Sequence, residues 1–296
     1  MNPAVFVLGD GPVGLALATA CLRAGLPVLG IHGRDPERTA RAGSRIGVLG
    51  SGGPLPAAVA LADVVVVAVG DRKIPAAAAE LGATLAASAT RVVLHTAGSV
   101  PSAEVLAAIQ PRVAGVGTLH PLLSVTSSTA GNGAEALRRP GAAFGIEGDP
   151  PAVAIARHLV ESLGARALLL RPGTLALYHA GAVLASNHVV ALAELATGLF
   201  EKAGIERQDA VPGVAALIAS VAENLLRVGL PEALTGPIVR GDAGTVERHL
   251  EALARSAPTL LDLYQRLGRE TLALARQRPG GPGDETAARL TRLLST

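Results

Sequence analysis

The sequence is poor in aromatic residues and in cysteine. Aromatic side chains make up 2% of the 296 residues and tryptophan is absent, so a folded core must be built from alanine, valine and leucine. Because Cys21 is the only cysteine, the chain cannot form an internal disulfide. The first expected strand begins at residue 4, which leaves no room for a signal peptide. These features predict a protein of the reducing cytoplasm.

Charged residues are also few, and their signs nearly balance. They make up 17% of the chain, with 26 basic and 24 acidic residues and a net charge of +2. This balance gives no support for a nucleic-acid surface, so we expect no nucleic-acid partner. Hydrophobic residues make up 49%, which allows a large core, and the length predicts two domains. We expect no metal site.

A glycine-rich segment follows the first apolar run, Val5–Leu8. Gly9, Gly11 and Gly14 fill the pattern Gly-x-Gly-x-x-Gly, and Leu15–Arg23 continues with helical spacing. In dinucleotide-binding folds these glycines permit a tight turn, the approach of a pyrophosphate and close helix packing, and the helix N-terminus offers N–H groups to phosphates. The alternative is a glycine-rich turn without a ligand. The cofactor-binding residues predicted here are Gly9, Asp10, Gly11, Pro12, Val13 and Gly14.

The segment after the second expected strand bears on the choice between NAD and NADP. An acidic residue there would hold the ribose 2′-OH of NAD. Asp35 precedes Pro36, however, and fits a helix N-cap better. Arg34 stands where a 2′-phosphate would be met, with Arg38 nearby, and a planar guanidinium suits a phosphate. We therefore predict NADP, with NAD as the alternative, and add Gly33 and Arg34 to the cofactor site.

Strands alternate with helices through the first half of the chain. The expected strands are Val5–Leu8, Pro27–Ile31, Asp63–Val69, Arg91–Leu94, Val113–Leu119, Ala142–Ile146 and Ala167–Leu170. This alternation predicts an α/β Rossmann domain with a doubly wound parallel sheet, in which ligands bind at the carboxyl ends of the strands. At these strand ends we predict Val69 and Gly70 as cofactor-binding residues, His95 as a substrate-binding residue and His120 as a catalytic residue. The alternative for both histidines is a polar residue that caps a strand end.

The sequence from residue 172 onward predicts helices only. Arg171-Pro172-Gly173 marks the boundary between an NADP-binding Rossmann domain, 1–171, and an all-helical substrate and dimerisation domain, 172–296. Thr174 is expected to cap one long helix, Leu175–Ala203, that is apolar on most sides and buried all round. Polar residues interrupt it, so we expect no membrane contact. We predict instead that it passes through a homodimer interface.

Three polar residues form one strip on this expected helix. At 100° per residue, Ser186 lies about 20° and Asn187 about 80° around the axis from His179. A histidine can exchange a proton near neutral pH, so His179, Asn187 and Ser186 are predicted to be catalytic together with His120. The alternative is a buried, hydrogen-bonded strip. Arg240, on a later loop, is predicted to hold a substrate carboxylate, with an interfacial ion pair as the alternative.

These residues also carry a family resemblance over nearly the whole chain. The segments Tyr178-His179-Ala180, Ser186-Asn187, Leu234–Asp242 and His249-Leu250 resemble a bacterial family that joins a Rossmann-like domain to a C-terminal domain of unknown function, number 2520. His95–Ser99 and His120–Leu122 fit the same family. More distantly, the chain is similar to pyrroline-5-carboxylate reductase, ketopantoate reductase and prephenate dehydrogenase. The resemblance implies an all-α C-terminal domain of the 6-phosphogluconate dehydrogenase type, NADP and a dimer.

The chain departs from several of these relatives in one respect. They use a lysine on the long helix as an acid, whereas the lysines here are Lys73 and Lys202, and neither lies near the start of that helix. His179 would have to take this role. The function predicted is an NADP-dependent oxidoreductase that transfers a hydride between NADPH and a small carbonyl or imine carboxylate. The alternative is a non-catalytic dinucleotide-binding regulatory or interaction protein, and coenzyme F420 as hydride partner is a third option.

Overall fold

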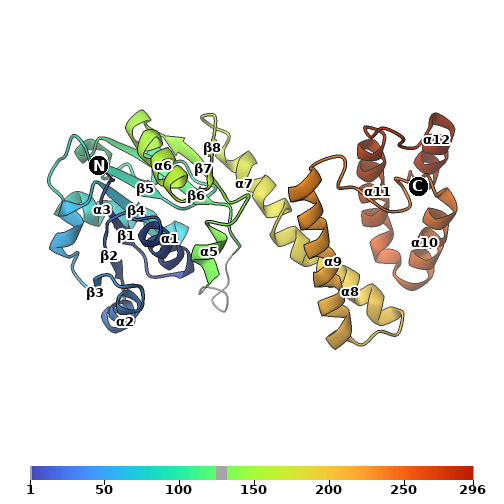
Figure 1. The fold of residues 1–296 in the computed structure, drawn as a ribbon, viewed down its shortest axis with the longest axis horizontal. Coiled ribbons are helices and arrows are strands. Elements are labelled where there is room, and N and C mark those ends of the chain that lie inside the picture. The colour runs from blue at the N-terminus through green and yellow to red at the C-terminus, as the bar shows by residue number, and fades with distance from the viewer. Residues whose placement is uncertain (1, 125–131, 296) are drawn as a thin grey trace. The chain divides into compact units, whose positions relative to one another are not determined.

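The computed structural model describes residues 2–124 and 132–295, which form two compact units, Met1–Ser186 and Asn187–Thr296 (Figure 1). The first unit contains β1 (Val5–Leu8), α1 (Pro12–Arg23), β2 (Val28–Gly33), α2 (Pro36–Ile46), β3 (Gly50–Gly52), η1 (Ala57–Leu61), β4 (Val64–Val67), η2 (Asp71–Lys73), α3 (Ile74–Thr84), β5 (Val92–His95), α4 (Ser102–Val105), η3 (Gln110–Arg112), β6 (Gly115–Pro121), α5 (Gly133–Ala136), β7 (Ala143–Gly148), α6 (Pro150–Ser162), β8 (Arg166–Leu169) and α7 (Leu175–Leu184). The domain boundary predicted at residue 171 is a division by sequence pattern; the compact units divide later, so α7 goes with the first unit.

The eight strands of the first unit form one sheet in the order β3-β2-β1-β4-β5-β6-β7-β8. The predicted Rossmann fold is confirmed, but the sheet is not wholly parallel, because β7 pairs antiparallel with β6 and parallel with β8. A parallel pair needs a long crossover, usually a helix. Within the described residues, the segment between β6 and β7 contains only the four-residue helix α5. The short strand β3 pairs parallel with β2 at one edge of the sheet.

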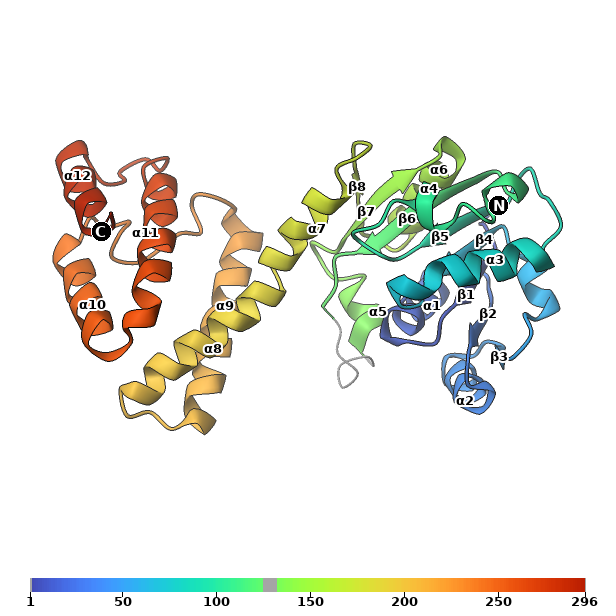
Figure 2. The same ribbon diagram turned by 180° about the vertical axis from the view of Figure 1, so that it is seen from behind.

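Apolar side chains cover both faces of this sheet. All four residues of β1 are buried, and their side chains alternate between the two faces, as in a strand that is covered on both sides. Helices α1, α5 and α6 pack on one face (Figure 1), and α3, α4 and η1 pack on the other (Figure 2). The carboxyl ends of the parallel strands therefore remain available for ligands.

The second unit consists of helices. These are α8 (Asn187–Lys202), α9 (Arg207–Val228), α10 (Ala243–Ser256), η5 (Pro258–Leu260), α11 (Leu261–Ala275) and α12 (Asp284–Leu293). Residues of α10, α11 and α12 enclose a small core. Helix α9 begins at Arg207 and contains Pro212 in its interior.

The long helix expected from residue 175 to 203 is present over Leu175–Lys202, but a turn at Ala185 and Ser186 interrupts it and separates α7 from α8. The Ser186 N–H donates to the Val183 carbonyl, and its hydroxyl donates to the Ala182 carbonyl. Such side-chain bonds to the preceding turn favour bends in helices. Thr174 occupies the N-cap position of α7 without capping it, since its hydroxyl donates to the Arg171 carbonyl.

Two stretches have the length and composition of membrane spans, Leu175–Lys202 and Arg207–Val228. Each has a mean hydropathy of 1.4, but only 6% of each window is buried in the chain. The expectation that the first stretch is buried all round is therefore not met within one copy. Exposed apolar surfaces of this size mark interaction sites.

Candidate functional site

The three glycines of the first loop differ in how closely other atoms approach them. Gly9 has a φ of +136°, and an added Cβ would lie 2.1 Å from the carbonyl oxygen of Ala68. A Cβ on Gly14 would lie 2.2 Å from the Gly9 carbonyl oxygen, whereas one on Gly11 would meet nothing within 4 Å. The first and third glycines are thus required by the fold, and the second leaves open space, as the dinucleotide-binding pattern predicts.

A cavity of about 540 Å³ lies beside this loop. That volume suits a small-molecule or cofactor site. The residues predicted to bind the cofactor that line it are Gly9, Asp10, Gly11, Gly33, Arg34, Val69 and Gly70. Pro12, Val13 and Gly14 form the first turn of α1, whose leading N–H groups have no partners inside the helix. The residues present therefore fit a dinucleotide.

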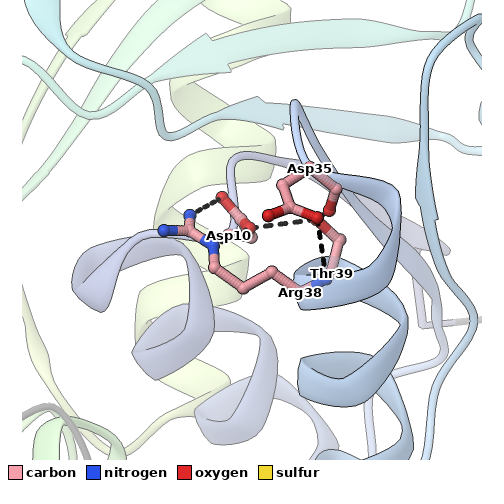
Figure 3. Close-up of polar contacts among 4 residues, drawn as sticks. All are labelled: Asp10, Asp35, Arg38 and Thr39. Atoms are coloured by element: carbon pink, nitrogen blue, oxygen red, sulfur yellow. Dashed lines mark hydrogen bonds and ion pairs between the residues drawn. The ribbon is translucent and has the colours of Figure 1, made fainter.

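Arg38 lines this cavity and is paired with Asp10. Figure 3 shows the contacts that hold the two side chains. Arg38 Nη2 lies 2.6 Å from Asp10 Oδ1, and Arg38 Nε lies 2.9 Å from Asp10 Oδ2. The Thr39 hydroxyl lies 2.9 Å from the same Oδ2 and 2.7 Å from the Asp35 carbonyl oxygen. The Asp35 carboxylate accepts the Arg38 N–H, which confirms the predicted N-cap of α2. The glycine loop and α2 are thus tied together by a two-bond ion pair.

This ion pair separates the roles of two arginines. Burial of Asp10 acts to raise the pKa of its carboxyl, but the hydrogen bonds from Arg38 and Thr39 outweigh burial and the pKa lies below its usual value. Gly33 makes room for the pair, since an added Cβ would lie 2.4 Å from the Thr39 hydroxyl oxygen. Arg34 lines the same cavity and makes no ion pair with any residue that the structure describes. Its guanidinium is therefore free to meet an anion, whereas that of Arg38 already holds one.

A buried row of polar groups crosses the sheet at the strand ends. His95 on β5 lies opposite Thr118 on β6, which lies opposite Glu147 on β7. His95 Nδ1 accepts the Ala97 N–H at 3.1 Å, so its single proton sits on Nε2 and points to the Thr118 hydroxyl at 3.0 Å. That hydroxyl donates to Glu147 Oε1 at 2.6 Å.

The burial of His95 bears on its predicted role. Its side chain is fully buried, and burial lowers its pKa to about 4 despite the opposing effect of Glu147. Because both ring nitrogens are engaged inside the fold, the geometry favours a structural role that holds the loop after β5. Substrate binding by His95 stays a prediction.

Two further histidines and a tyrosine meet beside that loop. His120 comes from β6, and Tyr178 and His179 come from α7. His120 Nδ1 lies 3.0 Å from the Tyr178 hydroxyl, and the His120 and His179 ring centroids are 5.7 Å apart. Both imidazoles press against Gly98, where an added Cβ would lie 2.7 Å from His120 Nε2 and 2.5 Å from His179 Cδ2. The structure therefore brings the predicted His120 and His179 together.

The sequence analysis missed Tyr178 as a site residue. Burial, and to a lesser extent His179, lowers the pKa of His120 to about 4. Burial raises the pKa of Tyr178 to about 12. The signal that was available is the position of Tyr178 directly before His179, but the partner on β6 is far away in sequence.

The remaining predicted residues are divided between the units. Ser186 ends the first unit, and its hydroxyl donates to the Ala182 carbonyl at 2.6 Å. Asn187 starts α8, and Arg240 lies in the loop before α10, both in the second unit. Asp242 caps α10 by accepting the Thr245 N–H. The catalytic roles of Ser186 and Asn187 and the carboxylate-binding role of Arg240 stay predictions.

Family comparisons match both parts of the chain. Residues 142–271 match the family described as a domain of unknown function (DUF2520), and residues 4–97 match the family described as NADP oxidoreductase, coenzyme F420-dependent. The resemblance predicted from the sequence is therefore confirmed. NADP, the predicted cofactor, is the one that the N-terminal family uses. No curated protein has a sequence that matches the chain.

Solved structures share the fold at low sequence identity. A protein from Thermotoga maritima is 24% identical with a TM-score of 0.70, covering 92% of this chain and 98% of that one. Pyrroline-5-carboxylate reductase from Coxiella burnetii is 14% identical with a TM-score of 0.65 and full coverage of both chains, 100% each. An imine reductase from Streptomyces aurantiacus is 18% identical with a TM-score of 0.59, covering 99% and 100%. The chain thus shares the fold of these proteins.

Proposed function

We propose that this chain is an NADPH-dependent reductase of a small carbonyl or imine compound that carries a carboxylate. The observation that carries the proposal is that one unit contains both a dinucleotide cavity and an imidazole cluster. The cavity lies at the glycine loop, and the cluster, formed by His120 and His179 with Tyr178, lies at the carboxyl ends of β5 and β6. Relatives of the same fold are named as imine and pyrroline-5-carboxylate reductases. Ligands of open α/β sheets bind at this edge.

Each residue has a defined part in this proposal. NADPH, when bound, supplies a hydride to the substrate carbon. His179 donates the proton that the oxygen or nitrogen of the reduced group takes up. Ser186 and Asn187 orient that group, and Arg240 holds the carboxylate by two parallel hydrogen bonds.

The glycine loop and the residues that line the cavity beside it hold the cofactor. The pyrophosphate lies against the open space at Gly11 and the N-terminus of α1. Arg34 meets the 2′-phosphate, because the guanidinium of Arg38, the other arginine of the cavity, is already paired with Asp10. Val69 and Gly70 line the same cavity at the end of β4.

We also propose that the protein is a homodimer in which a second copy covers the apolar helices α8 and α9. Most of the large exposed apolar side chains of the second unit lie on these two helices. The chain is not proposed to bind a membrane, since polar residues interrupt the first apolar stretch.

A screen of small oxo acids, cyclic imino acids and oxidised coenzyme F420, following the NADPH absorbance, tests the function. His179→Ala should lower turnover by about 10²–10⁴-fold, the usual effect of removing a general acid, and leave NADPH binding unchanged. His158→Ala, at an exposed position on α6, is the matched control and should retain full turnover. NADPH binding without turnover of any compound would favour the non-catalytic binding protein. Full turnover by His179→Ala alongside an inactive His120→Ala would move the proton donor to His120.

A further inference from the structure

Both tyrosines of the chain are hydrogen-bonded to Nδ1 of a histidine. Tyr178 OH lies 3.0 Å from His120 Nδ1, and Tyr264 OH lies 2.7 Å from His249 Nδ1. In both pairs the rings meet edge to face, with centroids 5.6 Å and 6.0 Å apart. Only the first pair lies in the imidazole cluster, and the second is a matched reference within the same chain.

The space for the first pair is made by two glycines. Gly145 on β7 lies opposite His120 on β6, and an added Cβ on Gly145 would lie 2.5 Å from the Tyr178 hydroxyl oxygen. An added Cβ on Gly98 would lie 2.7 Å from His120 Nε2. A side chain at either position would displace the pair, because Tyr178 packs against the backbone of β7 at Gly145 and His120 packs against the backbone of the loop after β5 at Gly98.

We assign the direction of this hydrogen bond from the protons that the two side chains carry. The buried phenol of Tyr178 keeps its proton, because burial raises its pKa to about 12. A hydrogen bond from the Gly145 N–H to the phenol oxygen acts to lower this pKa, but by less than burial raises it. His120 is neutral near neutral pH, since burial lowers its pKa to about 4. A neutral imidazole carries one proton, so a phenol that donates to Nδ1 leaves that proton on Nε2.

We propose that Tyr178 is a positioning residue that holds His120 as an Nε2–H donor, and that this donor selects a carbonyl substrate over an iminium substrate. This inference rests on the proposed reductase function. A carbonyl oxygen accepts the Nε2–H as a hydrogen bond, and when the carbonyl carbon gains the hydride that NADPH supplies, the oxygen takes the proton that His179 donates and the product is an alcohol. An iminium nitrogen has no lone pair and cannot accept that hydrogen bond. Among the described residues, His120 Nε2 has no hydrogen-bond partner.

The test is the tautomer of His120, read by long-range ¹H–¹⁵N NMR on the full-length protein, with His120→Gln used to assign its signals. The wild-type spectrum should show His120 protonated on Nε2 and unprotonated on Nδ1. Tyr178→Phe should change this pattern to the other tautomer or a mixture, and should leave the His249 signals unchanged. Tyr264→Phe should do the reverse.

Two outcomes would overturn the tautomer assignment. One is a wild-type His120 with its proton on Nδ1, a result that needs no variant and so stands even if Tyr178→Phe fails to fold. The other is a folded Tyr178→Phe protein, checked by NADPH binding, in which the His120 signals do not move.

A kinetic comparison tests the substrate class. Small 2-oxo acids should be reduced, whereas preformed N-methyl iminium carboxylates should not, and Tyr178→Phe should lower kcat for the oxo acid at least about tenfold through loss of an aligned donor. Reduction of the iminium salts in preference to the oxo acids would overturn the substrate part. If neither class is reduced, the proposed function fails, and the NMR result still decides the role of Tyr178.

Discussion

The two units of the chain bury their apolar residues to very different degrees. In the first unit both faces of the sheet are covered, and the strand residues of β1 and β4 are buried almost completely. In the second unit, large apolar side chains of α8 and α9 remain exposed, namely Val190, Leu192, Leu195, Phe200, Val211, Leu217, Val221, Leu225, Leu226 and Val228. Apolar patches of this extent mark interaction surfaces. The sheet of the first unit is thus covered by its own helices, whereas α8 and α9 of the second unit present an exposed apolar surface.

The largest expected effect is on the glycine loop of the first unit. Gly9→Ala would place a Cβ 2.1 Å from a backbone oxygen at a φ of +136°, where an alanine is strained in any surroundings. We expect a loss of stability of more than about 4 kcal/mol, which is exceptional for one substitution, and no NADPH binding. Thermal unfolding and NADPH titration measure both.

Gly11→Ala is the matched control for this prediction. An added Cβ at Gly11 meets nothing within 4 Å, and its backbone conformation of φ −75° and ψ 174° suits alanine. This variant should keep the melting temperature of the wild type and lose affinity for NADPH, because the space is needed by the pyrophosphate. Equal NADPH affinity in Gly11→Ala and wild type would contradict the position assigned to the cofactor.

The next effect concerns the exposed helices of the second unit. Leu226 on α9 is 69% exposed in one copy. If a second copy covers it, Leu226→Glu should weaken dimerisation by about 2–4 kcal/mol, the range of an interface hot spot. Light scattering over a concentration series measures the dissociation constant.

Leu61→Glu separates this effect from a general response to surface charge. Leu61 lies on η1 of the first unit and is 74% exposed, so its replacement should leave the dimer intact. A wild-type protein that stays monomeric at micromolar concentration would contradict the proposal that a second copy covers α8 and α9.

The parts of the fold that sequence predicted are those that local chemistry determines. The glycine loop, the buried strands and the cap Asp35 each depend on neighbours within a few residues. The antiparallel pairing of β7 with β6 depends on a connection whose direction no local pattern records. The break at Ser186 was hidden because apolar spacing continues through it.

The candidate site shows the same division. His120 and His179 were found because histidines at strand ends and on an apolar helix stand out in a sequence. The hydrogen bond between Tyr178 and His120 joins residues that are 58 positions apart, and the Thr118 to Glu147 bond joins two strands whose pairing was not expected to be antiparallel. Such contacts follow from the tertiary fold, so no periodicity or motif could have predicted them.

A smaller effect distinguishes the two arginines of the cofactor cavity. Arg34→Ala should reduce the preference for NADPH over NADH by about 1.5–3 kcal/mol, the value of a charged hydrogen bond. Arg38→Ala should reduce it less, because the guanidinium of Arg38 is already paired with Asp10. Fluorescence titrations with both cofactors measure the preference. Equal affinities of the wild type for NADPH and NADH would contradict the role of Arg34.

The smallest effect tests whether local helix chemistry is alike in the two units. Asp242 caps α10 as Asp35 caps α2, and hydrogen bonds from Thr245 hold the pKa of Asp242 below its usual value. Since the folded pKa is lower than the unfolded one, the cap stabilises α10 above the unfolded pKa and loses this effect as the pH falls through the folded pKa. Asp242→Ala should raise the unfolding equilibrium constant about fivefold near neutral pH, and Asp242→Asn, which keeps an acceptor oxygen, by less. Chemical denaturation at neutral and acidic pH measures both variants. If the stability loss of Asp242→Ala is the same in acid as at neutral pH, the charged cap is not its cause. The two units would then differ in their helix caps as well as in their exposed surface.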